Sequence, residues 1–257
     1  MSRASWVGRG DTRPQAPVAE PRRLVRSGAA VVALGVTLAV LAAPGPLSER
    51  AGAVAPQSLV ATEAPVPSGM GVNPSITLRQ VACPSAGSCV AVGFANTGSA
   101  GNLGVIETLS GGTWSNQVAP LPANAGTPGT GHQVVSLLSV SCPAAGSCVA
   151  VGSYHDTSNS PWPLVETLSS GTWTPTIGAV PADAGTDAGG DANATLSSVT
   201  CPATGSCVAA GSYENTSAAT TGLIDTLTAG NWSAIKAPVP SGAGAGTESL
   251  SVVSCGS

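Results

Sequence analysis

A tandem repeat limits the folds open to this chain more than any other feature of its sequence. Two cysteines six positions apart occur three times at one fixed interval, and a tryptophan keeps the same interval. The repeated residues are the pairs Cys83 and Cys89, Cys142 and Cys148, Cys201 and Cys207, and the tryptophans Trp114, Trp173 and Trp232. A unit that carries its own cysteines and tryptophan is one supersecondary module copied along the chain. The architecture can therefore be argued from a single copy.

Each copy contains four short segments with strand character, separated by turn residues. In the first copy they are residues 78–83, 89–93, 103–109 and 113–119. Short strands with Gly, Ser and Asn turns every eight to twelve positions are typical of all-β proteins. The second segment, CVAVG in the first two copies, is apolar on both faces. We therefore expect neighbouring modules to cover it from both sides.

These units predict an all-β, β-propeller-like repeat domain over residues 54–257. Its repeats run over about residues 78–136, 137–195 and 196–249, and a partial fourth repeat begins at residue 250. A segment resembling the fourth strand of a unit, residues 58–67, precedes the first repeat. Propellers usually close with four or more blades, so the count of three full units is low. A β-trefoil, which also has three four-stranded units, is the alternative fold.

Each cysteine pair is expected to staple the hairpin between the first and second strands of its unit. Five intervening residues with Pro and Gly suit a hairpin whose cysteines face each other. Zinc is the alternative, but the spacing exceeds that of common zinc pairs and no histidine recurs with the period. Cys255 begins the partial fourth repeat and is expected to be unpaired. It indicates either truncation of a longer repeat array or self-association that completes the ring.

The first 53 residues differ in composition from the rest and predict an export signal. They contain seven of the nine Lys and Arg residues, six of them ahead of an uninterrupted apolar run at positions 27–43. This order is typical of a signal peptide, with Ala53 as the best cleavage position. A retained N-terminal anchor is the alternative, because the run is at the lower limit for spanning a bilayer. In both cases the repeats are expected outside the cell or on its surface, where disulfides form.

The strings CPSAGSCVAVG and IETLSGGTW resemble the cysteine-containing tandem repeats of secreted actinobacterial proteins, whose units look like β-propeller blades. The resemblance covers about residues 58–255. The segments TLSGGTW, TLSSGTW and TLTAGNW also resemble degenerate Asp-box turns of sialidase-like propellers. Ser110, Ser169 and Ala229 stand near where that motif has an aspartate. Since the Asp box is a folding turn in those families, the resemblance implies a propeller fold and no catalysis.

Comparison of the copies predicts a recognition surface at one edge of the units. The turns that join the first strand to the second and the third to the fourth are nearly identical between copies. The loops at the opposite edge differ: residues 94–102, 153–161 and 212–222 inside the units, and 123–136 and 182–194 between them. Variation confined to one edge of a repeated scaffold is typical of a binding face. Drift of exposed loops is the alternative.

Four aromatic residues lie in or beside these variable loops and are the candidate ligand-binding residues. They are Phe94, Tyr154, Trp162 and Tyr213. Exposed aromatic rings can stack on sugars or anchor a protein partner. The alternative is that they cap the ends of strands. Trp162 is expected to be exposed, because its Pro-Trp-Pro setting is unsuited to a central strand.

The carboxylates Glu107, Glu166 and Asp225 also recur with the period, and paired carboxylates can hydrolyse glycosides. A catalytic pair must differ in environment within one pocket. A residue repeated in every module more often makes the same structural hydrogen bond in each. We therefore predict no catalytic residue here. An extracellular glycan-active hydrolase that uses loop carboxylates is kept as the alternative function.

No metal or cofactor is predicted. His132 and His155 lie in loops of different kinds, and Asp183, Asp187 and Asp191 do not match a standard calcium loop. Beyond residue 53 only two cations face ten carboxylates, which gives a net charge of about -8 and argues against nucleic acid as a partner. A sialidase-type site is also disfavoured, because it needs clustered arginines. The sequence thus favours an exported, non-enzymatic module that binds glycans or proteins through its variable loops.

Overall fold

The computed structural model describes residues 65–68, 70, 74–98, 101–127, 134–185, 192–242 and 246–256. All of them belong to the second of the two units into which the chain divides, Leu59–Ser257. The predicted signal peptide or anchor lies outside the described residues, as does most of the predicted leading strand. The described part of that leading strand, residues 65–67, is not in a strand. None of the described residues belongs to a helix long and apolar enough to cross a membrane.

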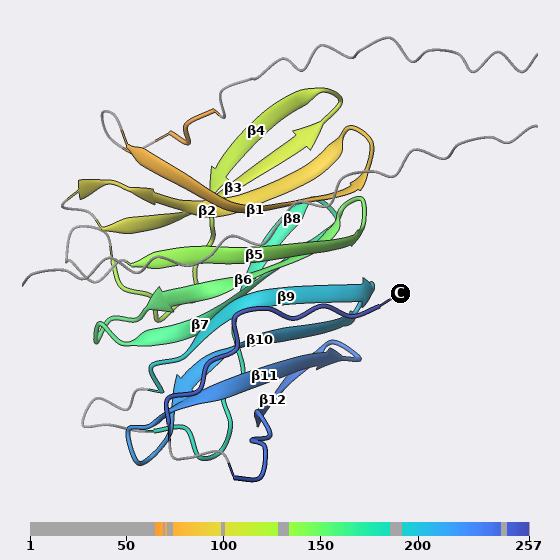
Figure 1. Ribbon diagram of the computed structural model, residues 1–257. Coiled ribbons are helices and arrows are strands. Elements are labelled where there is room, and N and C mark those ends of the chain that lie inside the picture. Colours follow the sequence, from red (N-terminus) through yellow and green to blue (C-terminus); the bar gives the residue numbers. More distant parts are fainter. Residues whose placement is uncertain are drawn as a thin grey trace, which may run out of the picture. The chain divides into compact units, whose positions relative to one another are not determined.

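The described residues form three four-stranded antiparallel sheets, which we call blades 1, 2 and 3 (Figure 1). Blade 1 consists of β1 (Ser75–Ser85), β2 (Ser88–Asn96), β3 (Asn102–Ser110) and β4 (Thr113–Val118). Blade 2 consists of β5 (Val135–Ala144), β6 (Ser147–His155), β7 (Pro161–Ser169) and β8 (Thr172–Ile177). Blade 3 consists of β9 (Thr195–Ala203), β10 (Ser206–Glu214), β11 (Thr220–Thr228) and β12 (Asn231–Lys236). Strand order in each sheet follows the sequence. The fold is all-β with propeller-like repeats, as predicted, and its sheets remain separate rather than sharing the barrel of a β-trefoil.

Blades pack face to face, so that the middle blade is apolar on both sides. Val92 and Ile106 of blade 1 share one buried cluster with Leu164 of blade 2. Val165, next to Leu164 on β7, points the other way and joins Leu223 in the cluster between blades 2 and 3. Alternate residues of one strand therefore serve two interfaces. We call the side of a blade that faces the preceding blade its rear face, and the opposite side its forward face.

The first hairpin of each blade contains the same β-bulge. In blade 2, Leu137 pairs with Gly152 and Ser139 with Val151, which leaves one extra residue on β5. Glycine is required on β6 because a Cβ on Gly152 would lie 1.8 Å from the carbonyl oxygen of Ser136. The recurring glycine of the CVAVG and CVAAG segments is thus explained by close backbone approach.

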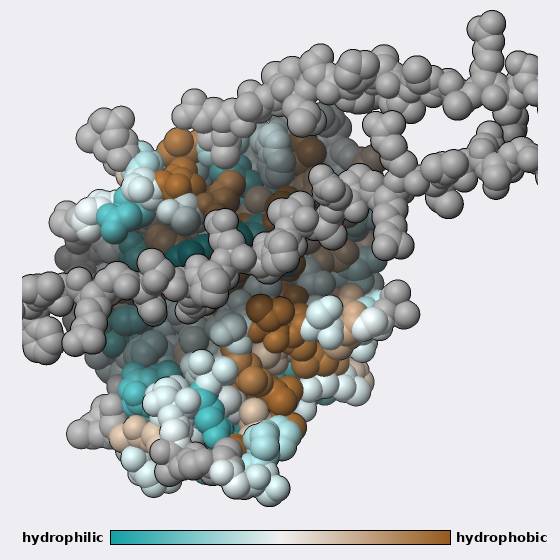
Figure 2. Space-filling view, viewed as in Figure 1, coloured by the Kyte–Doolittle hydropathy of each residue, from teal (hydrophilic) through white to brown (hydrophobic). Residues whose placement is uncertain are grey.

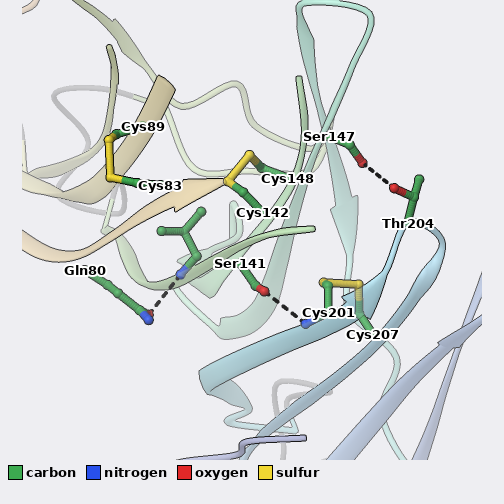
Figure 3. Close-up of a disulfide and its surroundings, with 11 residues drawn as sticks. Gln80, Cys83, Cys89, Ser141, Cys142, Ser147, Cys148, Cys201, Thr204 and Cys207 are labelled. Atoms are coloured by element: carbon green, nitrogen blue, oxygen red, sulfur yellow. Dashed lines mark hydrogen bonds between the residues drawn. A yellow bond between two sulfur atoms is a disulfide. The ribbon is translucent and has the colours of Figure 1, made fainter. Parts of the chain in front are cut away.

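The cysteines of each repeat form a disulfide across the first hairpin, as the spacing predicted (Figure 3). The Cα atoms of Cys142 and Cys148 are 4.1 Å apart, and the two other pairs show the same separation. Cys255 is exposed and free. Three disulfides in one small domain favour an oxidising, extracellular compartment.

A side chain on the first strand of each blade bonds to the first strand of the next. The Val140 N–H donates to Oε1 of Gln80 at 3.1 Å, and the Val199 N–H donates to Oγ of Ser139 at 3.0 Å. The C-terminal segment, residues 246–256, repeats this contact, because the Val253 N–H donates to Oγ of Ser198 at 3.1 Å.

The C-terminal segment therefore lies where the first strand of a following blade would lie. Leu250 packs beside Gly222 of β11, just as Leu137 packs beside Gly104 of β3. The Leu250 N–H also donates to the carbonyl of Gly211 at 3.0 Å. Residues 250–256 are not assigned to a strand, however, since the described part of the chain offers them no second strand with which to form a hairpin.

Candidate ligand-binding rim

The variable loops gather at one edge of the three blades and form the candidate binding surface. We call this surface the rim. It comprises the described residues of the loops inside the blades, 97–98, 101, 156–160 and 215–219, and of the loops between blades, 122–127 and 181–185. The rim is the edge that the sequence predicted to vary.

Each loop inside a blade is closed by a short polar side chain at its start. Asp156 Oδ1 accepts hydrogen bonds from the N–H groups of Ser158 at 2.8 Å and Ser160 at 3.1 Å. Asn215, the equivalent residue of the next repeat, accepts in the same way from Ser217 at 2.9 Å and Ala219 at 3.1 Å. Such local side-chain bonds mimic a backbone turn. The first copy uses a different arrangement, in which Thr97 Oγ1 donates to the carbonyl of Gly101 at 2.8 Å.

Loops of neighbouring blades are joined by backbone hydrogen bonds. The Gly126 N–H donates to the carbonyl of His155 at 2.9 Å, and the Thr157 N–H donates to the carbonyl of Asn124 at 3.0 Å. The next junction repeats both bonds. There the Gly185 N–H donates to Glu214 at 2.7 Å and the Thr216 N–H donates to Asp183 at 3.0 Å. The rim is consequently a connected frame.

Tyr154 and Tyr213 are buried, with no exposed surface, so the expectation that they present their rings to a ligand is wrong. The Tyr154 hydroxyl donates to Oδ1 of Asn124 at 2.9 Å, and the Tyr213 hydroxyl donates to Oδ1 of Asp183 at 2.7 Å. Each tyrosine thereby fastens the loop that leaves the preceding blade. Burial, the hydrogen bond to Asp183 and its negative charge raise the pKa of Tyr213.

Phe94 is not equivalent to the two tyrosines. The residue of blade 1 that corresponds to Tyr154 and Tyr213 is Ala95, which is buried beneath Met70 in a cluster of its own. Phe94 is partly exposed, and the guanidinium carbon of Arg79 lies 5.3 Å from the centre of its ring. This is a cation–π contact, which occupies one face of the ring.

Trp162 lies inside β7, opposite Tyr154, and not outside the sheet as its flanking prolines predicted. The Pro163 carbonyl accepts a hydrogen bond from the Gly178 N–H at 2.8 Å. A backbone N–H at this position would point to the same side, where β8 has already ended, so proline breaks no hydrogen bond between β7 and β8. The Trp162 side chain is partly exposed, and its Nε1–H donates to Oδ2 of Asp156 at 3.2 Å. Of the four aromatic candidates, Phe94 and Trp162 keep exposed surface.

The periodic carboxyl groups lie on the third strand of each blade and are fully buried. Oδ2 of Asp225 accepts from the Ala179 N–H of blade 2 at 3.1 Å. The residue of blade 1 that corresponds to Ala179 is Pro120, which has no N–H to offer Glu166. Both oxygens of Glu166 and of Glu107 lack a hydrogen-bond partner among the described residues. The expectation of one identical structural bond in every copy is therefore wrong.

Burial raises the pKa of all three carboxyl groups, because it penalises the charged form. The pKa of Glu166 rises to about 8, that of Glu107 to about 7 and that of Asp225 to about 6. Asp225 shows the lowest value since two backbone N–H groups stabilise its charged form. The three side chains have no exposed surface, so a substrate could not reach them from solvent.

The remaining candidates are only partly within the described residues. Nδ1 of His155 lies 3.1 Å from Oδ1 of Asn159 within the same rim loop, and Asp183 is the acceptor for Tyr213. His132, Asp187 and Asp191 lie outside the described residues. Among the residues that the structure describes, no three His, Cys, Asp or Glu side chains are grouped so that they could hold a metal ion.

Sequence reasoning missed the residues that fix the rim, although a signal was present. Asn124 and Asp183 occupy the same position in successive repeats, as do Tyr154 and Tyr213. Asp156 and Asn215 also keep the period. A shared period predicts a shared structural role, and the two tyrosines were grouped with Phe94 and Trp162 only because they are aromatic.

The fold and the rim define a disulfide-stapled, propeller-like repeat protein. No protein-family model matches the sequence. No curated protein sequence matches it either. Among solved structures, the chain is similar to the sialidase of Trypanosoma rangeli in complex with sialic acid, with 14% identity and a TM-score of 0.40. The match covers 62% of this chain and 29% of the sialidase chain, so the chain spans less than a third of that structure. A likeness this weak does not bear on function.

Proposed function

We propose that the protein is an exported, non-enzymatic binding module that holds a neutral glycan on its rim. The observation that carries the proposal is that the rim combines a rigid frame with variable tips. Asp156 and Asn215 close equivalent loops by equivalent bonds, and both loops continue with Thr and Ser, but the exposed residue that follows is Asn159 in blade 2 and Ala218 in blade 3. Recognition surfaces are commonly built from variable loops on a constant scaffold.

The chemistry of the tips favours a neutral, hydroxylated ligand. Their side chains offer hydroxyl and amide groups, and Trp162 supplies a partly exposed ring beside them. Beyond residue 53 the chain has only Arg79 and Lys236 as cations, which disfavours phosphorylated or nucleic-acid ligands. A cavity of about 520 Å³ adjoins the blade 3 tip and is lined by Asn215, Lys236 and Glu248, among other residues. Polar groups at a rigid concave surface fix the orientation of a small ligand.

The placement of the carboxyl groups supports a non-enzymatic role. Glu107, Glu166 and Asp225 are buried between strands, and Asp156 uses both carboxylate oxygens to hold its own loop. A glycosidase needs two carboxyl groups on either side of an accessible bond. The alternative, an extracellular hydrolase, would need two accessible carboxyl groups other than these.

A glycan array followed by calorimetry on the exported protein tests this proposal. The Asn159→Gly variant removes an exposed amide while keeping the left-handed backbone at φ 68° that glycine accepts. We expect at least tenfold weaker binding, a loss of about 1.4 kcal/mol. The Asn231→Gly variant is the matched control, because Asn231 is equally exposed at the opposite edge. The proposal would be contradicted if both variants weakened glycan binding equally. It would also be contradicted if the protein bound a protein ligand and no glycan, or if it released free sugar from a glycan.

A further inference from the structure

Met70 covers one end of the rear face of blade 1, where it packs with Ala95 and Val105. The described residues leave the part of that face around Val81 open. Val81 is 55% exposed and Leu78 41%, whereas the equivalent residues Val140 and Leu137 of blade 2 are 1% and 0% exposed. Trp114 is also partly exposed, while Trp173 is buried against blade 1. Together with neighbouring residues, Leu78, Val81 and Trp114 line a depression of about 360 Å³.

The forward face of blade 3 is open in the same way. Val208 and Ile224 are partly exposed, although their equivalents in blade 2, Val149 and Val165, are 6% and 0% exposed. Ile235 on the outer strand β12 is 56% exposed, but its equivalents Gln117 and Thr176 are exposed as well, so it lies outside the packed part of the face. Figure 2 shows hydrophobic residues gathered over the third sheet and the C-terminal segment. Contiguous apolar patches of this kind mark interaction sites.

We propose that these two faces bind each other between two copies of the chain, with the rear face of blade 1 of one copy packing on the forward face of blade 3 of the other. The partner is identified by the repeat itself. At both junctions within the chain, an apolar rear face packs on the apolar forward face of the preceding blade. The contact between copies continues an interface that the fold already builds twice. It goes beyond the proposed glycan site, because it uses the ends of the blade series and leaves the rim loops uncovered. Of the cavity beside blade 3, only the wall formed by residues 246–248 belongs to the C-terminal segment.

The C-terminal segment occupies part of the contact area and competes with the second copy. Leu250 and Val253 correspond to Leu78 and Val81 of β1, and they occupy the place that β1 of the incoming copy would take. A whole blade would cover Val208 and Ile224, which the segment leaves partly exposed. The segment must therefore leave this place when the two copies associate, and loosening it is expected to strengthen association.

The contact is heterologous, since it joins two different surfaces. Such contacts close into a ring if the rotation between copies permits it, and otherwise extend into a filament. Two copies bring together six of the described sheets, a number within the usual range for closed propellers.

Sedimentation equilibrium on the full exported chain tests the proposal with a pair of complementary variants. Val81→Glu places a charge on the rear face and Ile224→Glu places one on the forward face. We expect each variant alone to self-associate at least tenfold more weakly than the wild type. Because each variant keeps the face that the other has lost, an equal mixture should form one-to-one dimers. Val81 is exposed and Ile224 is partly exposed, so the fold should survive both changes.

Two further variants complete the experiment. Ile177→Glu is the matched control, because Ile177 is 41% exposed on β8 of the middle blade and should leave association unchanged. Leu250→Ser loosens the C-terminal segment and should strengthen association at least tenfold. The proposal would be overturned if the wild type and Leu250→Ser both showed the mass of a single chain at every concentration. It would also be overturned if Val81→Glu associated as strongly as the wild type, or if the mixture of the two variants stayed monomeric.

Discussion

The hydroxyl of Tyr213 in blade 3 donates a hydrogen bond of 2.7 Å to Oδ1 of Asp183, which lies in the loop leaving blade 2. Tyr154 and Asn124 form the equivalent pair one repeat earlier, at 2.9 Å. The bond fixes the rim to the neighbouring blade through a side chain that is itself buried. Residues that looked like ligand contacts are thus part of the frame that would hold ligand contacts in place.

Removal of this hydroxyl should destabilise the fold. We expect Tyr213→Phe to lower the free energy of unfolding by about 1.5 kcal/mol, because its acceptor is charged, and Tyr154→Phe to lower it by about 1 kcal/mol. Asp183 is exposed, so water can solvate its carboxylate once the bond is lost, which limits the loss. Urea unfolding measures both values. A loss below the error of the measurement in both variants would show that the bonds do not fasten the rim.

Glu166 should make stability fall as the pH rises. In the folded protein burial raises its pKa from the ordinary value of 4.5 to about 8. Between these values the unfolded chain has released the proton while the folded protein retains it, so the free energy of unfolding decreases with rising pH. The contribution is intact below pH 4.5 and is lost by about pH 8.

Glu166→Gln removes this dependence while keeping the size of the protonated side chain. We expect the variant and the wild type to have equal free energies of unfolding near pH 4. At pH 8.5 the value for the variant should be higher by about 2 kcal/mol. Glu107 and Asp225 titrate in the same direction, so part of the slope will remain. Glu248→Gln, at a partly exposed position, serves as the control. Parallel pH profiles for Glu166→Gln and wild type would refute the prediction.

The hairpin disulfides should be detectable by mass and should contribute to stability. Alkylation of the denatured, unreduced protein should label Cys255 alone, because the other six cysteines are paired. The double variant Cys142→Ala with Cys148→Ala should lower the free energy of unfolding by about 2 kcal/mol, the value for closing so short a loop. More than one label per chain before reduction would contradict the pairing.

Gly152→Ala should be strongly destabilising. The added Cβ would lie 1.8 Å from the Ser136 carbonyl oxygen, and the main chain on both sides is held in the β5–β6 ladder. We expect a loss of about 3 kcal/mol or more in the free energy of unfolding, from overpacking against backbone that cannot move freely. Gly256→Ala is the control, since nothing lies within 4 Å of its added Cβ. If the two variants unfolded at the same temperature, this prediction would be wrong.

Local sequence patterns were sufficient to predict the repeat, the four strands of each unit, the disulfide pairs and the edge at which the loops vary. Strand alternation, turn residues and cysteine spacing act over a few positions, so each can be recognised within a short stretch of chain. The period also made the equivalence of Tyr154 with Tyr213, and of Asn124 with Asp183, readable from the sequence.

The burial of individual side chains, in contrast, followed only from how the blades pack. Tyr154 is covered by the loop of a neighbouring blade, and Glu166 lacks a donor because Pro120, in another blade, stands where Ala179 stands in the next repeat. Val81 and Val140 are the same residue type in the same register, yet one is 55% exposed and the other 1%. Burial depends on what packs against a strand, and that partner lies about one repeat away in the chain, beyond the reach of local pattern.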